Sequence, residues 1–108
     1  MDVMNMTVTQ IIENAEKRKA ELSNEIALYE RIEADAAQTR DLAEEVHYLK
    51  PNETTRDLLE KAEDNYWQKS NHLYELNHEH SQLSSIIWRL QKLAKCEQIY
   101  QVAYILGL

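Results

Sequence analysis

The sequence contains very few residues that bend or end a helix. Among its 108 residues there is one glycine, Gly107, one proline, Pro51, and no phenylalanine. Since glycine and proline punctuate turns and loops, this scarcity excludes a fold of many short strands and a glycine-rich loop that could hold phosphate. The charged and helix-forming residues that fill the chain instead predict an all-α protein made of long helices.

Other absences limit the chemistry and the location of the protein. Cys96 is the only cysteine, so no disulfide can form within the chain. No stretch approaches the roughly 20 apolar residues of a membrane span, and the first residues lack the basic start and apolar core of a secretion signal. Nothing resembles a nucleophile elbow or a cofactor loop. We therefore expect a cytoplasmic protein that is not an enzyme, takes no cofactor and does not enter a membrane.

Charge is abundant but unevenly distributed. The formal net charge is −7, and residues 30–64 hold eleven acids against five bases. Because nucleic-acid binding requires clustered positive charge, direct binding of nucleic acid is not expected. The acidic segment could instead contact a basic surface of another protein.

The first helix is predicted to begin with a capping box, in which Thr7 and Gln10 satisfy each other's backbone N–H groups. An apolar seam follows at alternating steps of four and three residues. After Tyr29 the apolar residues suggest an extra step of three, which would overwind a coiled coil locally. The predicted seam is Val8, Ile12, Ala15, Lys19, Leu22, Ile26 and Tyr29, then Ile32, Ala36, Thr39, Ala43 and Val46.

The second helix is predicted from Pro51 onward. Proline disfavours helical backbone in the residue before it, so the first helix should stop near Lys50, and Asn52 or Thr54 should cap the second. An uninterrupted heptad pattern then begins. Its positions are Leu59, Ala62, Tyr66, Lys69, Leu73, Leu76, His80, Leu83, Ile87, Leu90 and Ala94.

These patterns predict a single helical domain over residues 1–108. Helix one covers about 7–50, the turn 51–53 and helix two about 54–106. A turn this short makes the helices antiparallel, as in a coiled-coil hairpin, and sets Val46 beside Leu58 or Leu59. The rival topology is a compact four-helix bundle, with breaks near 34–39 and 77–81.

A two-helix hairpin covers only one stripe of each helix, so apolar residues elsewhere indicate further contacts. Trp67, Tyr74 and Trp88 share one heptad position about 100° from the seam, and a second set widens the seam on its other side. Members of that second set are Leu58, Ile86, Leu93 and Tyr100. We expect a homodimer in which two hairpins form a four-helix bundle, although the aromatic rings could also simply cover the seam.

The carboxyl end is strongly apolar. If Cys96 lies opposite Val8, the last residues extend past the start of helix one and need another surface. The predicted contact residues there are Tyr100, Val102, Tyr104, Ile105 and Leu106. Self-association, a fold-back onto the amino-terminal methionines, or capture by a different protein would each bury them.

Two Glu-x-x-His motifs raise the question of metal binding. Glu44 with His47, and Glu75 with His78, each place a carboxylate and an imidazole one helical turn apart, as in di-iron bundles. Within one hairpin the two motifs would lie far apart, so we predict no metal site and interpret them as surface pairs.

The sequence therefore favours a non-catalytic helical interaction protein, such as an adaptor, scaffold or chaperone-like module. Its contacts would be the aromatic residues and the carboxyl-terminal tail. A small acidic inhibitor that occludes a basic surface of an enzyme or nucleic-acid-binding complex is the alternative, and a metal-binding helical bundle is third.

Overall fold

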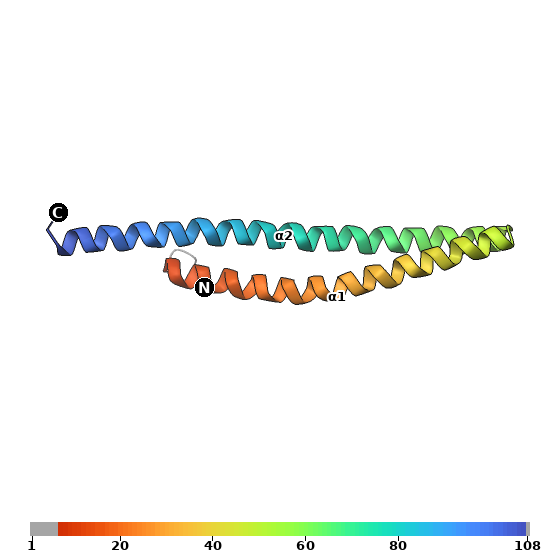
Figure 1. Ribbon diagram of the computed structural model, residues 1–108, viewed down its shortest axis with the longest axis horizontal. Helices are drawn as coiled ribbons and strands as arrows, with labels where there is room; N and C mark the ends of the chain where they lie inside the picture. The colour runs from red at the N-terminus through yellow and green to blue at the C-terminus, as the bar shows by residue number, and fades with distance from the viewer. Residues whose placement is uncertain (1–6, 108) are drawn as a thin grey trace. The chain divides into compact units, whose positions relative to one another are not determined.

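A computed structural model describes residues 7–107, with the side chains of 7–96 and 106–107. It contains two helices, α1 (Val8–Leu49) and α2 (Glu53–Ile105), and no strand within the described part. The helices turn back on each other in an antiparallel hairpin (Figure 1). Each end of the two helices lies one residue from the end predicted from the sequence. Because α1 and α2 run unbroken, the rival topology with breaks near 34–39 and 77–81 is excluded.

Both helix starts are capped by side chains. The Thr7 N–H donates to Oε1 of Gln10 at 3.0 Å and the Gln10 N–H donates to Oγ1 of Thr7 at 3.2 Å, which confirms the predicted capping box. Asn52, one of the two predicted caps, starts α2, because its Oδ1 accepts the Thr55 N–H at 2.9 Å. These bonds satisfy backbone donors that a helix leaves unpaired in its first turn.

The chain divides into two compact units. One contains Met1–Leu22 with Glu79–Leu108, and the other contains Ser23–His78. Within the Ser23–His78 unit, Tyr29 meets His72 at a ring separation of 4.2 Å and the Arg40 guanidinium lies 4.2 Å from the Tyr66 ring. In the first unit, Arg18 pairs with Glu79 at 3.3 Å. Each unit is therefore a section of paired α1 and α2.

The α2 seam matches the predicted heptad. All eleven predicted positions, from Leu59 to Ala94, are buried or half-buried, and Thr55 extends the same pattern by one step toward the turn. The charged Lys69 and the imidazole of His80 are half-buried with the apolar residues. Long side chains can occupy such positions because their stems pack while their polar ends reach out.

The predicted slip in α1 is wrong. Thr39 and Val46 are exposed, whereas Glu33, Arg40 and His47 are half-buried. The seam therefore continues in steps of four and three from Val8 to His47 without an insertion. Polar residues can occupy it because Arg40 lies over the Tyr66 ring and His47 reaches the Thr55 hydroxyl. Hydropathy alone predicts that the neighbouring row, which contains Ile32, Thr39 and Val46, faces α2.

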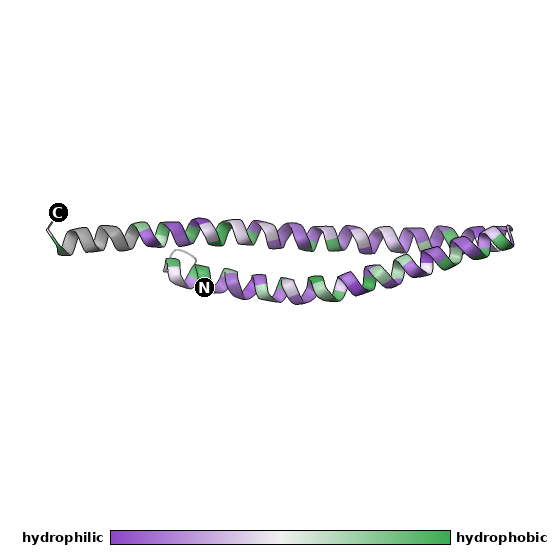
Figure 2. Ribbon diagram, viewed as in Figure 1, coloured by the Kyte–Doolittle hydropathy of each residue, from purple (hydrophilic) through white to green (hydrophobic). Residues whose placement is uncertain are grey.

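The buried core is small. Only five apolar residues of the described part are buried, and of these Leu22 is fully buried: Leu22, Ala36, Ala62, Leu76 and Ile87. Over the coloured residues, Figure 2 shows apolar and polar residues alternating along both helices without a long apolar block. The apolar core between the two helices is therefore thin over the residues whose side chains the structure describes.

Candidate interaction surfaces

The side chains that the hairpin leaves uncovered sort by chemistry. The large apolar side chains that are more than two-fifths exposed form two groups, and Leu106 belongs to neither of them. The aromatic flank consists of Tyr48, Trp67, Tyr74 and Trp88. The aliphatic flank consists of Leu28, Leu42, Val46, Leu49, Leu58, Ile86 and Leu93. Aromatic and aliphatic residues therefore occupy different rows of the helices.

Heptad geometry places these groups on opposite sides of the seam. In α2, Trp67, Tyr74 and Trp88 directly follow a seam residue, whereas Leu58, Ile86 and Leu93 directly precede one. At 100° per residue, the two rows lie about 160° apart around the helix. In the first unit, Arg18 of α1 and Glu79 of α2 each directly precede a seam residue, so both lie in the row of the aliphatic flank. These two residues form an ion pair. That contact confirms that this row of α1 and this row of α2 share one side.

Three of the four rings on the aromatic flank lie beside another ring or a cation and are still exposed to solvent. Trp67 meets Tyr66 edge-on at 5.5 Å, and Tyr74 stacks on His78 at 6.2 Å. In the other unit, Nζ of Lys92 lies 3.8 Å from the Trp88 ring centre. Trp67 and Tyr74 are 60% and 70% exposed. Exposed tryptophan and tyrosine are the residues most enriched at the energetic centres of protein interfaces.

The structure adds members to the predicted aliphatic row. Leu58, Ile86 and Leu93 were predicted from the sequence, but Leu28, Leu42 and Leu49 of α1 were missed. The signal was available, because these three leucines repeat at intervals of fourteen and seven residues in one helical row. The assumed slip obscured it, since that slip placed Val46 in the buried seam.

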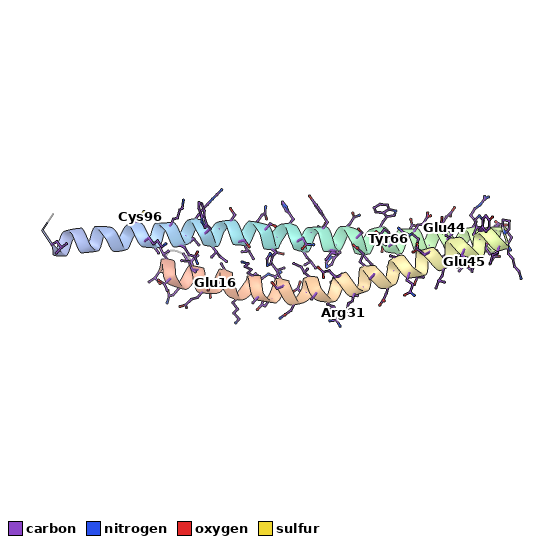
Figure 3. The ribbon with its side chains drawn as sticks, in the orientation of Figure 1. Glu16, Arg31, Glu44, Glu45, Tyr66 and Cys96 are labelled. Carbon is purple, nitrogen blue, oxygen red and sulfur yellow. The ribbon has the colours of Figure 1, made fainter. Side chains whose placement is uncertain are left out.

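The carboxyl-terminal contact residues are only partly described. Tyr100, Val102, Tyr104 and Ile105 lie outside the residues whose side chains the structure describes, whereas Leu106 is exposed. The backbone of α2 continues past the first described residues of α1 (Figure 1). Cys96 is exposed on this helix and is labelled in Figure 3.

Comparison of the chain with models of protein families, with curated protein sequences and with solved structures finds no match. Function is therefore inferred from the side chains of the hairpin itself.

The turn forms a hydrogen-bonded cluster around the hydroxyl of Thr55. Oγ1 of Thr55 lies 2.8 Å from the Lys50 carbonyl, 3.1 Å from the Asn52 N and 2.9 Å from Nδ1 of His47. A threonine hydroxyl has one proton and two lone pairs, so it accepts from the Asn52 N–H and donates its proton to the carbonyl of Lys50 or to that of Asn52, which lies at 3.1 Å. When that proton points to a carbonyl, the contact with His47 at 2.9 Å requires the Nδ1–H form of the ring, which then donates to the second lone pair of the hydroxyl. His47 thus serves the turn rather than the Glu44 motif.

Arg40 of α1 contacts Tyr66 of α2, farther from the turn than the Thr55 cluster. The Arg40 side chain is 30% exposed, and its guanidinium lies over the Tyr66 ring and contacts Oδ1 of Asp41 at 3.3 Å. Burial alone lowers the pKa of Arg40, but the hydrogen bond and attraction of Asp41, together with Tyr66, raise it above its ordinary value. Arg40 therefore stays charged at every physiological pH.

The remaining acidic residues near the turn face solvent. Glu44 and Glu45 are exposed on α1, as are Glu60, Glu63 and Asp64 on α2 (Figure 3 labels the first two). Within the described part of the chain, no three His, Cys, Asp or Glu residues gather closely enough to hold a metal ion. No helix there is long and apolar enough to cross a membrane.

Proposed function

We propose that this protein is a non-catalytic helical interaction protein that acts as a homodimer, two hairpins forming a four-helix bundle. The observation that carries the proposal is the contrast between five buried apolar side chains and the larger number of leucines, tyrosines and tryptophans left exposed on two flanks. Apolar side chains in contact with water cost free energy, and a second hairpin covers one flank while thickening the core.

The area of the chain supports this proposal. The solvent-accessible area is 8683 Å², whereas a compact chain of 12.8 kDa exposes roughly 6300 Å². The difference is on the order of what each chain loses in a permanent homodimer. In the dimer, the aromatic flank and the carboxyl-terminal tail then contact a further protein, in the manner of an adaptor, scaffold or chaperone-like module.

Solution mass tests the proposal. Size-exclusion chromatography with light scattering, on the full chain over a wide range of protein and salt concentrations, should give twice the chain mass. Apolar contacts keep this mass as salt rises, because screening weakens charge contacts and not burial. A chain that stays monomeric at every concentration would overturn the homodimer.

The alternative is a small acidic inhibitor that occludes a basic surface. It is supported by the exposed carboxylates near the turn, which include Glu44, Glu45, Glu60 and Glu63. Binding of this kind should weaken steeply with salt, because it depends on exposed charges. Titration with polylysine as a basic probe, at low and high ionic strength, measures whether the acidic surface binds at all; charge reversal at Glu60 and Glu63 should then reduce the binding.

A further inference from the structure

Beyond the seam that packs on α2, α1 carries a second seam in the Ser23–His78 unit. It consists of Leu28, Ile32, Asp35, Thr39, Leu42, Val46 and Leu49, at alternating steps of four and three residues. Five of these seven positions are apolar, and Leu28, Leu42, Val46 and Leu49 are 51%, 57%, 46% and 69% exposed. Such spacing is typical of a helix that packs against another helix. It also explains the misplaced slip, since Ile32, Thr39 and Val46 belong to this row.

We propose that a second copy of this chain docks on the second seam of α1, antiparallel, with the two-fold axis beside Ala37. The inference rests on the proposed homodimer and specifies its interface. In this register Leu28 packs against Val46 of the second copy, and Ile32 packs against Leu42. The polar pair Asp35 and Thr39 forms the central layer. Within these layers apolar residues thus meet apolar residues and polar residues meet polar ones, whereas Leu49 lies beyond them, opposite Glu25 of the second copy.

The symmetry of the pattern selects a second copy as the occupant. A two-fold contact uses the same surface on both chains, so a self-docking helix must be complementary to its own reverse. Moving the register by one heptad would set Val46 against Asp35 and lose this match. The polar central layer therefore fixes the register, as buried polar positions do in coiled coils.

Charge supports the same register. The row beside the second seam holds Arg31, Gln38 and Glu45, and all three are exposed. In the antiparallel arrangement Arg31 faces Glu45 of the second copy, Glu45 faces Arg31, and Gln38 meets its own counterpart on the axis. Figure 3 labels Arg31 and Glu45 on α1. The two-fold symmetry therefore places two pairs of opposite charge along the border of the contact.

The acidic charge on the rest of the surface also favours contact through the second seam. Copies that each carry a net charge of −7 repel one another, so they should meet where charge is lowest. Residues 30–64 hold eleven acids, yet Asp35 is the only charged residue among the seven positions of the second seam. One of the corresponding rows of α2 in this unit is polar, with Lys61, Gln68 and Glu75, and the other holds a single large apolar residue, Leu58, so α1 carries most of the contact.

The available area matches what a stable dimer requires. Five half-exposed large aliphatic side chains, Leu58 of α2 included, offer roughly 500 Å² of apolar surface. Since apolar atoms make up slightly more than half of an average interface, this corresponds to roughly 900 Å² on each partner. Standard stable interfaces bury about 800 Å² per partner.

Charge reversal on the full chain tests the register. Glu45→Arg alone, or Arg31→Glu alone, sets like charges face to face twice and should weaken self-association by roughly tenfold, measured by sedimentation equilibrium. The double variant Arg31→Glu with Glu45→Arg should restore the wild-type dissociation constant. Glu44→Arg is the matched control, because Glu44 is the exposed neighbour that lies outside the seam, and it should change nothing.

A second experiment tests the surface. Leu42→Glu should abolish self-association while circular dichroism stays unchanged, because Leu42 is already half exposed in the single chain. Trp67 and Trp88 are the only tryptophans and both lie on the aromatic flank, so their emission should not shift to the blue as the copies associate.

The outcomes separate the two proposals. A wild-type dimer that resists Leu42→Glu and the single reversals, or whose tryptophans become protected on association, overturns this interface and leaves the homodimer standing. Failure of the double reversal to restore binding overturns the register. A wild-type chain that is monomeric throughout overturns both the interface and the homodimer.

Discussion

Replacing Thr55 by valine should measure how much one hydroxyl stabilises the hairpin. Valine has the shape of threonine and a similar helix propensity, so the substitution removes the hydroxyl and little else. The hydroxyl of Thr55 lies within hydrogen-bonding distance of four groups, namely the carbonyls of Lys50 and Asn52, the Asn52 N–H and Nδ1 of His47. Its one proton and two lone pairs allow three hydrogen bonds. The reciprocal bond from the Thr55 N–H to Asn52 is retained.

The expected loss follows from this inventory. Each hydrogen bond contributes about 1 kcal/mol net, which would give about 3 kcal/mol for three. Lys50 and Asn52 are exposed, so water replaces part of the loss, and we expect a decrease of about 1 to 2 kcal/mol in the free energy of unfolding. With a urea slope of about 2 kcal/mol per molar, the midpoint should fall by about 0.5 to 1 M.

Urea unfolding followed by circular dichroism at one fixed protein concentration is the assay, because association makes stability depend on concentration. Thr55→Ser keeps the hydroxyl and should stay close to the wild type. Nitrogen NMR of His47 should show the Nδ1–H form in the wild type and lose that preference in Thr55→Val. An unchanged midpoint in the valine variant, or an equal loss in the serine variant, would refute the assigned role of the hydroxyl.

Three further predictions concern the core, the aromatic flank and the tail. Leu22→Ala should lower the free energy of unfolding by about 2 to 3 kcal/mol, because Leu22 is fully buried, whereas Leu106→Ala at an exposed site should change it little in the same urea titration. Trp67→Ala with Trp88→Ala should keep the helix content and the dimer mass, since both rings face solvent; marked unfolding would mean that the rings shield the seam. Removing residues 97–108 should keep the dimer mass and most of the helicity, because the proposed dimer contact lies on α1; a truncated chain that becomes monomeric would mean that the tail takes part in self-association.

Much of the fold follows from local sequence rules. The Thr7–Gln10 box and the stop before Pro51 depend on residues three apart or adjacent, so they can be predicted without knowing the partner helix. The α2 seam was predictable because large apolar residues fill most of its heptad positions, from Leu59 to Ile87. In such helices the pattern and the burial agree.

The second half of α1 was harder to interpret, because it holds two seams. Ile32, Thr39 and Val46 are more apolar than Glu33, Arg40 and His47, so hydropathy selects the wrong row to face α2. The polar row lies inward because Tyr66 and Thr55, supplied by α2, give partners to Arg40 and His47. A partner brought by the other helix is invisible to a periodicity within one helix. The role of Thr55 escaped prediction for the same reason.

The capped turn also has a consequence for the order in which the hairpin folds. His47 and Thr55 are eight residues apart, whereas Arg18 and Glu79 are separated by 61. Closing a longer loop costs more chain entropy, by about 0.6 kcal/mol for each doubling of its length, so the turn should close first and the helices should pair outward from it. Thr55→Val should then mainly slow folding, and Leu22→Ala should mainly speed unfolding. One hydroxyl at the turn would in this way set the rate at which every later contact becomes available.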